Sequence, residues 1–555
     1  MKDELNRNIN DLSLPGYDKP FYIAYTIVDV QNFEVNATLG ALLSSDDDRY
    51  KDWHVRVMVG DYDLNDENYS YTKPQEAIFR PSIQMPAEDD YLGIRRSLWL
   101  TTNNVYHSAA QTYKSKVDLI KHKQLNKSDL EIPDFSKAPV ENIYINSPML
   151  RYNKHDLEQK ARSISAVLKK YAEIHASGAS LSVVESVVYF VNSEGSVVRY
   201  PLSLASVTVY AETMAEDGET IKHGITYVEN DPDKLPSADS IIEDTKILAE
   251  NLIELRNAVR LEENYSGPVL LQNEAAAGLF ENLFFNKSEN LIASRESLQS
   301  SSQMNVYYSQ NDFSLESKID KLVIAKNLSV ISKPGLKKYN EIPLLGSFII
   351  DAEGVIPQKN LILIEKGVLK TLLNGRTPSR NVPESNGHNR FSYSEGNFIK
   401  QVGPGVIKVE NTEGIAFEQL KKSLIEQGKE EGLTEVILIK PLNVGGSVKP
   451  MNIYSIAVKT GEEHLLRGLK IIPAELSVLK RNVACSDNYF VSNVMVKVSY
   501  PSDMIQRNYL TGSLGLEGMP ASFIVPDAVL IDEMNFSPIR KSLTSLTPTI
   551  SNPVK

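Results

Sequence analysis

The sequence has 555 residues, of which 42% are hydrophobic and 23% charged, and 59 Lys and Arg against 71 Asp and Glu give a formal net charge of −12. A chain of this length exceeds a single hydrophobic core, which stops growing near roughly 250 to 300 residues, so two domains are expected. The negative charge repels phosphate backbones, and the basic segment 114–127 interleaves its lysines with apolar residues, as on a solvated helix face. We therefore expect no nucleic-acid partner.

Cysteine usage and hydropathy restrict the class of protein further. Cys485 is the single cysteine, which excludes an intramolecular disulfide and a multi-cysteine zinc site and is typical of a buried, unreactive thiol. The chain opens MKDELNRN, without an apolar signal segment, and no run of 18 apolar residues follows. We expect a cytoplasmic protein without membrane contact, or a periplasmic or exported one if a leader was removed.

The first half of the chain reads as an antiparallel sheet with helices between its strands. Alternating apolar residues predict strands over 21–29 and 54–62, and an apolar face at helical spacing predicts a helix over 153–175. Turn residues at 192–195 and again at Asp217 and Gly218 predict two hairpins.

A second helix and a turn signal suggest where one domain ends. The segment 237–259 has apolar residues at helical spacing behind Ser237 or Asp239 as a cap. The pair Gly267 and Pro268 follows and reads as a break in the chain. We predict an α+β fold with an N-terminal helix plus antiparallel-sheet domain (1–264), a strand-rich, partly barrel-like C-terminal domain (265–538) and a polar tail (539–555).

The second half is dominated by strand-like segments, including a hairpin that turns at Lys366 and Gly367. Between two of them lies the long loop 375–392, which fits either a functional segment or a solvated connection. The predicted strands are 345–351, 360–374, 434–442, 453–460, 488–500 and 521–534.

Local motifs for common chemistries are missing. The eight histidines include no two within a helical turn of each other, so no local pair can hold a metal. There is no G-x-S-x-G elbow, and the glycines of NVGGSVKP (443–450) lack the lysine offset of a phosphate-binding loop. Glu274 and Glu281, seven residues apart on one predicted helix face, are two turns apart and fit solvated or capping groups better than a carboxylate pair that shares a water.

Four segments, in order, carry a resemblance to a known family. They are GPVLLQNEAAAGLFENLF, then IPLLGSFIIDAEGVIPQKNLILIEKGVLKTLLNGRTPS, then SNGHNRFS, and finally TGSLGLEGMPASFIVPDAVLIDEM. The chain resembles the TldD/PmbA proteins, heterodimeric metallopeptidase subunits once called modulators of DNA gyrase.

The resemblance implies a zinc site that has lost its ligands. Catalytic members carry H-E-x-x-x-H on a helix and a distant third ligand, a cysteine. On this chain the corresponding positions are Asn273, Glu274, Gly278 and, for the cysteine, Leu514. A neutral amide, a glycine and a leucine cannot hold zinc tightly, and without the metal Glu274 has no water to deprotonate. The resemblance is therefore to the PmbA (TldE) type of subunit, which lacks the zinc ligands, and we expect no catalytic residue and no cofactor in this chain.

Three functions remain open from the sequence. The first is a non-catalytic subunit of a heterodimeric zinc peptidase, in which a TldD-like partner holds the zinc and this chain helps to enclose unfolded or short peptides. The second is a homodimeric peptide-binding or scaffold protein without a protease partner, and the third is an enzyme with a rebuilt site. The residues expected to line a peptide cleft are Asn273, Glu274, Arg376, Asn386, His388 and Arg390.

Overall fold

The structure, a computed structural model, describes residues 1–70, 83–123, 131–146, 150, 152–286, 290–295, 298–299, 315–394, 396–481, 483–497 and 516–539. Four sequence predictions fall wholly or partly outside these residues: the role of Leu514, the order of the tail after residue 539, the end of the basic segment 114–127 and the end of the predicted strand 488–500.

Helices are a minor part of the fold. Among the described residues, no helix is both long enough and apolar enough to cross a membrane. The α-helices are α1 (Lys2–Asp11), α2 (Tyr91–Lys123), α3 (Lys154–Ala166), α4 (Ala238–Asn257), α5 (Glu274–Phe285) and α6 (Phe417–Glu430).

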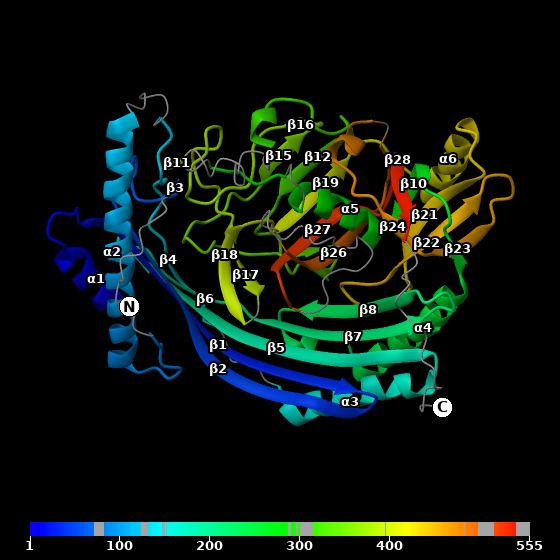
Figure 1. Ribbon diagram of the computed structural model, residues 1–555, viewed down its shortest axis with the longest axis horizontal. Coiled ribbons are helices and arrows are strands. Elements are labelled where there is room, and N and C mark those ends of the chain that lie inside the picture. Colours follow the sequence, from blue (N-terminus) through cyan, green and yellow to red (C-terminus); the bar gives the residue numbers. More distant parts are fainter. Residues whose placement is uncertain are drawn as a thin grey trace.

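A seven-stranded sheet with long, curved strands forms the N-terminal part (Figure 1). Neighbouring side chains on a strand face opposite sides of this sheet, so Val183 packs with α3 and α4 on one side while Val184 packs with Phe391 and Phe398 of the C-terminal part on the other. The sheet contains β1 (Pro20–Thr38), β2 (Ala41–Val59), β4 (Asn142–Tyr144), β5 (Ile174–Asn192), β6 (Val197–Pro201), β7 (Leu204–Met214) and β8 (Thr220–Glu229).

Two further sheets build the C-terminal part, which lies over the concave side of the first (Figure 1). One has nine strands: β9 (Val259–Arg260), β10 (Tyr265–Gln272), β20 (Gly414–Ile415), β21 (Glu435–Pro441), β22 (Met451–Ala457), β23 (Glu463–Arg467), β24 (Leu469–Ile471), β25 (Ala484–Ser486) and β28 (Ala528–Pro538). The other has six: β12 (Leu328–Ser332), β15 (Leu361–Glu365), β16 (Val368–Leu369), β19 (Val406–Asn411), β26 (Tyr489–Val496) and β27 (Met519–Pro526).

Short two-stranded ribbons complete the described strands. They are β3 (Tyr69–Ser70) with β11 (Leu298–Gln299), β13 (Lys338–Tyr339) with β14 (Ile342–Pro343), and β17 (Asn389–Ser394) with β18 (Asn397–Val402). The α+β class with a strand-rich C-terminal part is confirmed, although no sheet closes into a barrel among the strands that can be described.

Helix α5 lies in the largest hydrophobic core, between the nine-stranded and six-stranded sheets. Its buried residues share this core with Val269 and Leu271 of β10 and with Phe523 and Val525 of β27. The small alanines at its start let the helix approach the sheets closely, and the apolar residues of its later turns fill the space between them. The buried residues of the helix are Glu274, Ala275, Ala276, Ala277, Leu279, Phe280, Leu283, Phe284 and Phe285.

Several local predictions are confirmed. The turns at 192–195 and 215–219 join β5 to β6 and β7 to β8, and Lys366 and Gly367 join β15 to β16 with positive φ at both residues. Ser237 is the cap of α4, since its hydroxyl accepts a hydrogen bond from the Ser240 N–H at 3.2 Å. Cys485 is buried, and burial raises the pKa of its thiol to about 12.

Other predictions were wrong, either in the bounds of an element or in its presence. Helix α3 ends at Ala166, because β5 begins at Ile174 and pairs with β1 and β7. The segment 345–351 is an irregular loop, and 521–534 is two strands separated at Asp527. The pair Gly267 and Pro268 lies inside β10, at an irregularity in its pairing with β28, where a Pro without an N–H is tolerated.

Candidate functional site

The start of α5 is formed by the turn that leaves β10. Asn273 is the residue before the helix and has φ +50° and ψ −113°, a conformation that favours glycine. Its N–H donates to the Asp527 carbonyl at 2.7 Å, and its side chain makes no capping hydrogen bond to the helix. Backbone strain of this kind is common at functional sites, and here it occurs where the resemblance puts the first metal ligand.

Glu274, in the first turn of α5, is 8% exposed and forms an ion pair with Lys449, whose Nζ lies 2.8 Å from its Oε1. The other carboxylate oxygen, Oε2, is buried and has no hydrogen-bond partner. A carboxylate is favoured at a helix N-terminus, but one this buried needs a cation, and Lys449 provides it.

Gly278 faces open space, since a Cβ built on it would have no atom within 4 Å. The backbone thus leaves room for a side chain at the position of the second ligand, but none is present. Together, a neutral amide at Asn273, no side chain at Gly278 and an ammonium already paired with Glu274 do not fit a zinc ion. In the part of the chain that the structure describes, no cluster of three His, Cys, Asp or Glu side chains could hold a metal.

Arg376, the first of the four loop residues predicted for a peptide cleft, is fully buried. Its guanidinium donates to both carboxylate oxygens of Glu194 at 2.7 Å and to the Ser136 carbonyl at 2.7 and 2.9 Å. It also stacks on Phe135, with Cζ 3.9 Å from the ring centroid. Arg376 therefore joins the loop of the C-terminal part to two segments of the N-terminal part.

Asn386 and His388 form one buried hydrogen-bonded unit. Asn386 accepts from the Asn374 N–H at 2.8 Å and donates to the Leu372 carbonyl at 2.7 Å. Both oxygens of Asn386 lie 2.9 Å from His388 Nδ1, so Nδ1 carries the proton and Nε2 accepts from the Ser332 hydroxyl at 2.8 Å. Burial lowers the pKa of His388 to about 3, so the ring is neutral.

Arg390 is the fourth of these residues and is also buried. Its guanidinium donates to the carbonyls of Pro404 and Pro520 and lies over Phe348, 4.4 Å from the ring centroid. Burial lowers the pKa of Arg390 to about 9. The structure thus gathers all four loop residues in the interior, bonded to the chain's own groups, and their predicted contact with a peptide stays a prediction.

A cavity of about 290 Å³ lies next to this loop, between the concave side of the seven-stranded sheet and the C-terminal part. Strands β1, β2 and β5 contribute Tyr22, Ala24, Arg56 and Phe190 among others to its lining. Glu353, Thr377, Asn389 and Lys400 line it from the C-terminal part.

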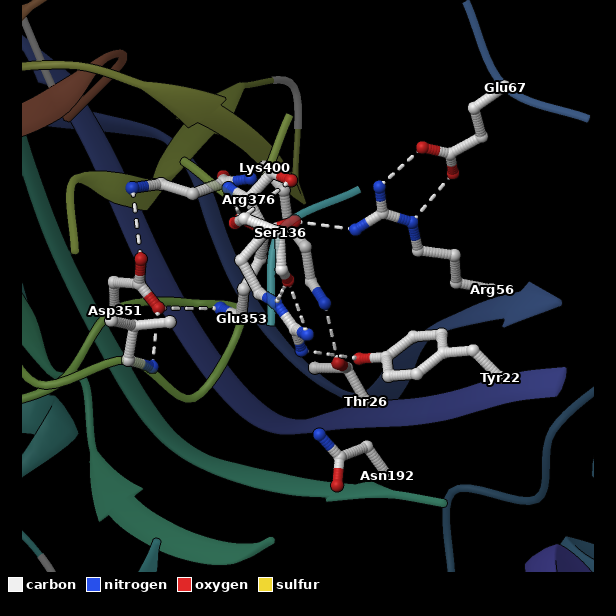
Figure 2. Close-up of polar contacts among 12 residues, drawn as sticks. Tyr22, Thr26, Arg56, Glu67, Ser136, Asn192, Asp351, Glu353, Arg376 and Lys400 are labelled. Carbon is white, nitrogen blue, oxygen red and sulfur yellow. Dashed lines mark hydrogen bonds and ion pairs between the residues drawn. The ribbon is translucent and has the colours of Figure 1, made fainter. Parts of the chain in front are cut away.

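Most charges around this cavity are paired. Arg56 donates to Glu67 at 2.5 and 2.7 Å and to Glu353 at 2.5 Å, and Glu353 also accepts from the Arg376 N–H at 2.7 Å (Figure 2). Although burial alone would raise the pKa of Glu353, the Arg56 charge holds it below its usual value. Nearby Asp351 accepts three backbone N–H bonds, but burial and the Glu353 charge raise its pKa to about 7.

Sequence reasoning missed the partners of these groups. Lys449 lies in the NVGGSVKP segment, whose glycines suggest a phosphate-binding loop and not an ion pair, and Arg56 lies in a strand of otherwise alternating valines. Two features of the sequence could have indicated buried ion pairs. One is a charged residue in an apolar strand, and the other is the two acidic residues Asp351 and Glu353 in the family-like segment IIDAEGVIP. The contacts themselves join distant segments, which no local pattern reports.

Comparisons with known proteins place these observations in context. Residues 264–537 match a family described as the PmbA/TldA metallopeptidase C-terminal domain. Among curated proteins, no match was found.

Three solved structures share the overall fold. A putative modulator of a DNA gyrase from Thermotoga maritima is 16% identical, with a TM-score of 0.54 over 93% of this chain and 96% of its own. TldE from Thermococcus kodakarensis is 12% identical, with a TM-score of 0.52 over 93% and 97%. A putative modulator of DNA gyrase from Bacteroides thetaiotaomicron is 11% identical, with a TM-score of 0.53 over 97% and 99%.

Proposed function

Since this chain belongs to the TldD/PmbA family of metallopeptidase-related proteins, we propose that it is the subunit of a heterodimeric zinc peptidase that carries no catalytic metal. In this assembly a TldD-like partner holds the zinc and hydrolyses the peptide bond. This chain helps to enclose and hold unfolded or short peptides.

The observation that carries the proposal is the ion pair between Lys449 and Glu274 at the start of α5. In a zinc peptidase the glutamate at this position must accept a proton from a metal-bound water. In this chain an ammonium occupies one oxygen of that carboxylate, and its fixed positive charge opposes the approach of a cation. The residues at positions 273 and 278 add no anionic or imidazole ligand. The charges at the site are therefore those of Glu274 and Lys449, which balance each other.

The surrounding sheets support the role in holding peptides. Strand β26 is the terminal strand of the six-stranded sheet among the described strands, and it packs beside α5. A terminal strand can pair with an extended peptide through main-chain hydrogen bonds, which gives affinity with little sequence selectivity.

The direct test is the native mass of the purified chain, alone and after mixing with a zinc-bearing relative with H-E-x-x-x-H from the same source. We expect a one-to-one complex that hydrolyses unstructured peptides and is inactivated by a chelator. A stable homodimer that ignores the relative and retains peptides without cleaving them would favour the scaffold function instead. Peptide hydrolysis by this chain alone would refute both.

A further inference from the structure

The lining of the cavity beside the seven-stranded sheet includes one cation, Lys400, that forms no ion pair with a carboxylate of the described residues. Arg56 is held by the two carboxylates of Glu67 and Glu353. Lys400, by contrast, forms no ion pair with a carboxylate of the described residues, and its Nζ donates to the neutral hydroxyl of Thr26 at 2.6 Å (Figure 2). The ammonium has three donors, so it can accept an anionic partner without giving up Thr26.

The rest of the lining suits an organic anion with hydrogen-bond donors. Asn389 Oδ1 is buried without a hydrogen-bond partner, so it can accept from a ligand N–H. Ala24 and Phe190, which belong to one apolar cluster, offer an apolar wall. A volume of about 290 Å³ lies just below the range of small-molecule sites, which is roughly 300 to 1,000 Å³, and so suits a small ligand.

These features favour a carboxylate over a phosphate. A single lysine without a second free cation balances one negative charge, whereas phosphate sites gather several donors, with arginine forks among the strongest. The backbone N–H groups next to a peptide's C-terminal carboxylate are donors of the kind that Asn389 Oδ1 lacks.

We propose that this cavity binds the C-terminal end of a short peptide, with the carboxylate on Lys400, the backbone N–H on Asn389 Oδ1 and the last side chain against Phe190. The choice of a peptide as the source of the carboxylate rests on the proposed function, while the carboxylate site itself rests on the cavity. Lys400 and Asn389 are thus assigned as binding residues of a site separate from the start of α5.

The charge on Lys400 makes binding sensitive to pH. Burial lowers its pKa to about 8, and it is faced by Glu353, Arg56, Asp351 and Asp52, of which the three acids raise the pKa and Arg56 lowers it. Raising the pH removes the proton of Lys400 near 8 and ionises Asp351 near 7, and both changes add negative charge around the site. Affinity for a carboxylate should therefore fall as the pH rises from 6.5 to 9.

The test is calorimetric titration of the full chain at pH 6.5 with trialanine, trialanine amide and free alanine. We expect trialanine to bind at least tenfold more tightly than its amide, and alanine to bind more weakly than trialanine. Equal affinity for trialanine and its amide, or no binding of either, would overturn the proposal. If free alanine binds as tightly as trialanine, the ligand is a free amino acid and not the end of a peptide, and the choice of a peptide is refuted.

Two variants and a control locate the site. Lys400→Met should lower trialanine affinity at least tenfold, whereas Lys408→Met should leave it unchanged. Lys408, like Lys400, lies over two aromatic rings, but it does not line the cavity. Should Lys400→Met fail to fold, Ala24→Leu fills the cavity without a change of charge and should abolish binding too. Trialanine affinity that is unaffected by a folded Lys400→Met or Ala24→Leu variant would refute the site. Assembly with a zinc-bearing relative is measured in a separate experiment. If trialanine does not bind, the proposed function is unaffected, and if no complex with the relative forms, the binding of trialanine can still be measured.

Discussion

Replacing Lys449 with methionine tests the account of the α5 site. The substitution keeps most of the length of the side chain but leaves the carboxylate of Glu274, whose side chain is 6% exposed, without its cation. Removal of one partner of a buried ion pair costs about 3 to 5 kcal/mol. The Lys449 side chain is 18% exposed, so water offsets part of the loss and we expect a decrease of about 2 to 3 kcal/mol in the free energy of unfolding.

The assay is guanidinium unfolding followed by far-ultraviolet circular dichroism, with two comparison variants. Lys246→Met removes the exposed pair of Lys246 with Glu243 and should cost less than about 1 kcal/mol. The double variant Lys449→Met with Glu274→Gln removes both charges and should recover at least half of the loss, because the neutral amide is cheaper to bury than a carboxylate. If Lys449→Met costs no more than Lys246→Met, the ion pair does not stabilise this site and the reasoning fails.

Three further outcomes are expected from single substitutions. Burial lowers the pKa of His388 to about 3, so on acidification the unfolded chain binds this proton first and the stability of the folded chain falls. The free energy of unfolding of His388→Gln, relative to that of wild type, should therefore rise by about 2 kcal/mol between pH 7.5 and 5. A difference between the two proteins that does not change with pH would contradict this prediction. Asp351, with a pKa raised to about 7, acts in the opposite direction in both proteins and cancels from the comparison. Asn273→Gly should raise the unfolding free energy by about 1 kcal/mol by relieving the φ of +50°, and a loss of stability would show that the asparagine side chain matters more than the strain. Arg376→Lys should lower the free energy of unfolding by about 2 to 3 kcal/mol, because lysine lacks the planar guanidinium that donates to both oxygens of Glu194. The exposed control Arg380→Lys should lower it by less than about 0.5 kcal/mol. Equal effects of the two substitutions in thermal denaturation would refute the role of Arg376 in joining the two parts of the chain.

Local patterns predicted elements where the residues themselves decide the structure. The buried run of β10, the alanines of α5 and the Ser237 cap follow from side-chain size, periodicity and hydrogen bonding within a few residues. The prediction of a strand over 345–351 was wrong because these apolar residues belong to a loop that packs against neighbouring sheets. An apolar run does not distinguish a strand from such a loop.

The site was harder to predict, because charge pairing joins distant segments. Arg376 is a polar residue in a loop with two prolines, which suggests exposure, yet Glu194 from a hairpin turn in the first half of the chain makes its burial possible. The resemblance places Glu274 at the position of the catalytic glutamate, but its partner in the structure, Lys449, belongs to a segment that contacts the start of α5 only in the folded chain. The resemblance indicated which ligands are missing, and the fold was needed to find what replaced them.

The most direct test of the central claim is zinc content and peptide hydrolysis of the complex formed with a zinc-bearing relative, prepared once with the wild-type chain and once with Glu274→Gln. The account predicts a single zinc per heterodimer, none in this chain alone, and the same hydrolysis rate with either form of the chain. Stoichiometric zinc in the isolated chain, or loss of hydrolysis on replacing Glu274, would mean that the α5 site of this subunit is catalytic after all.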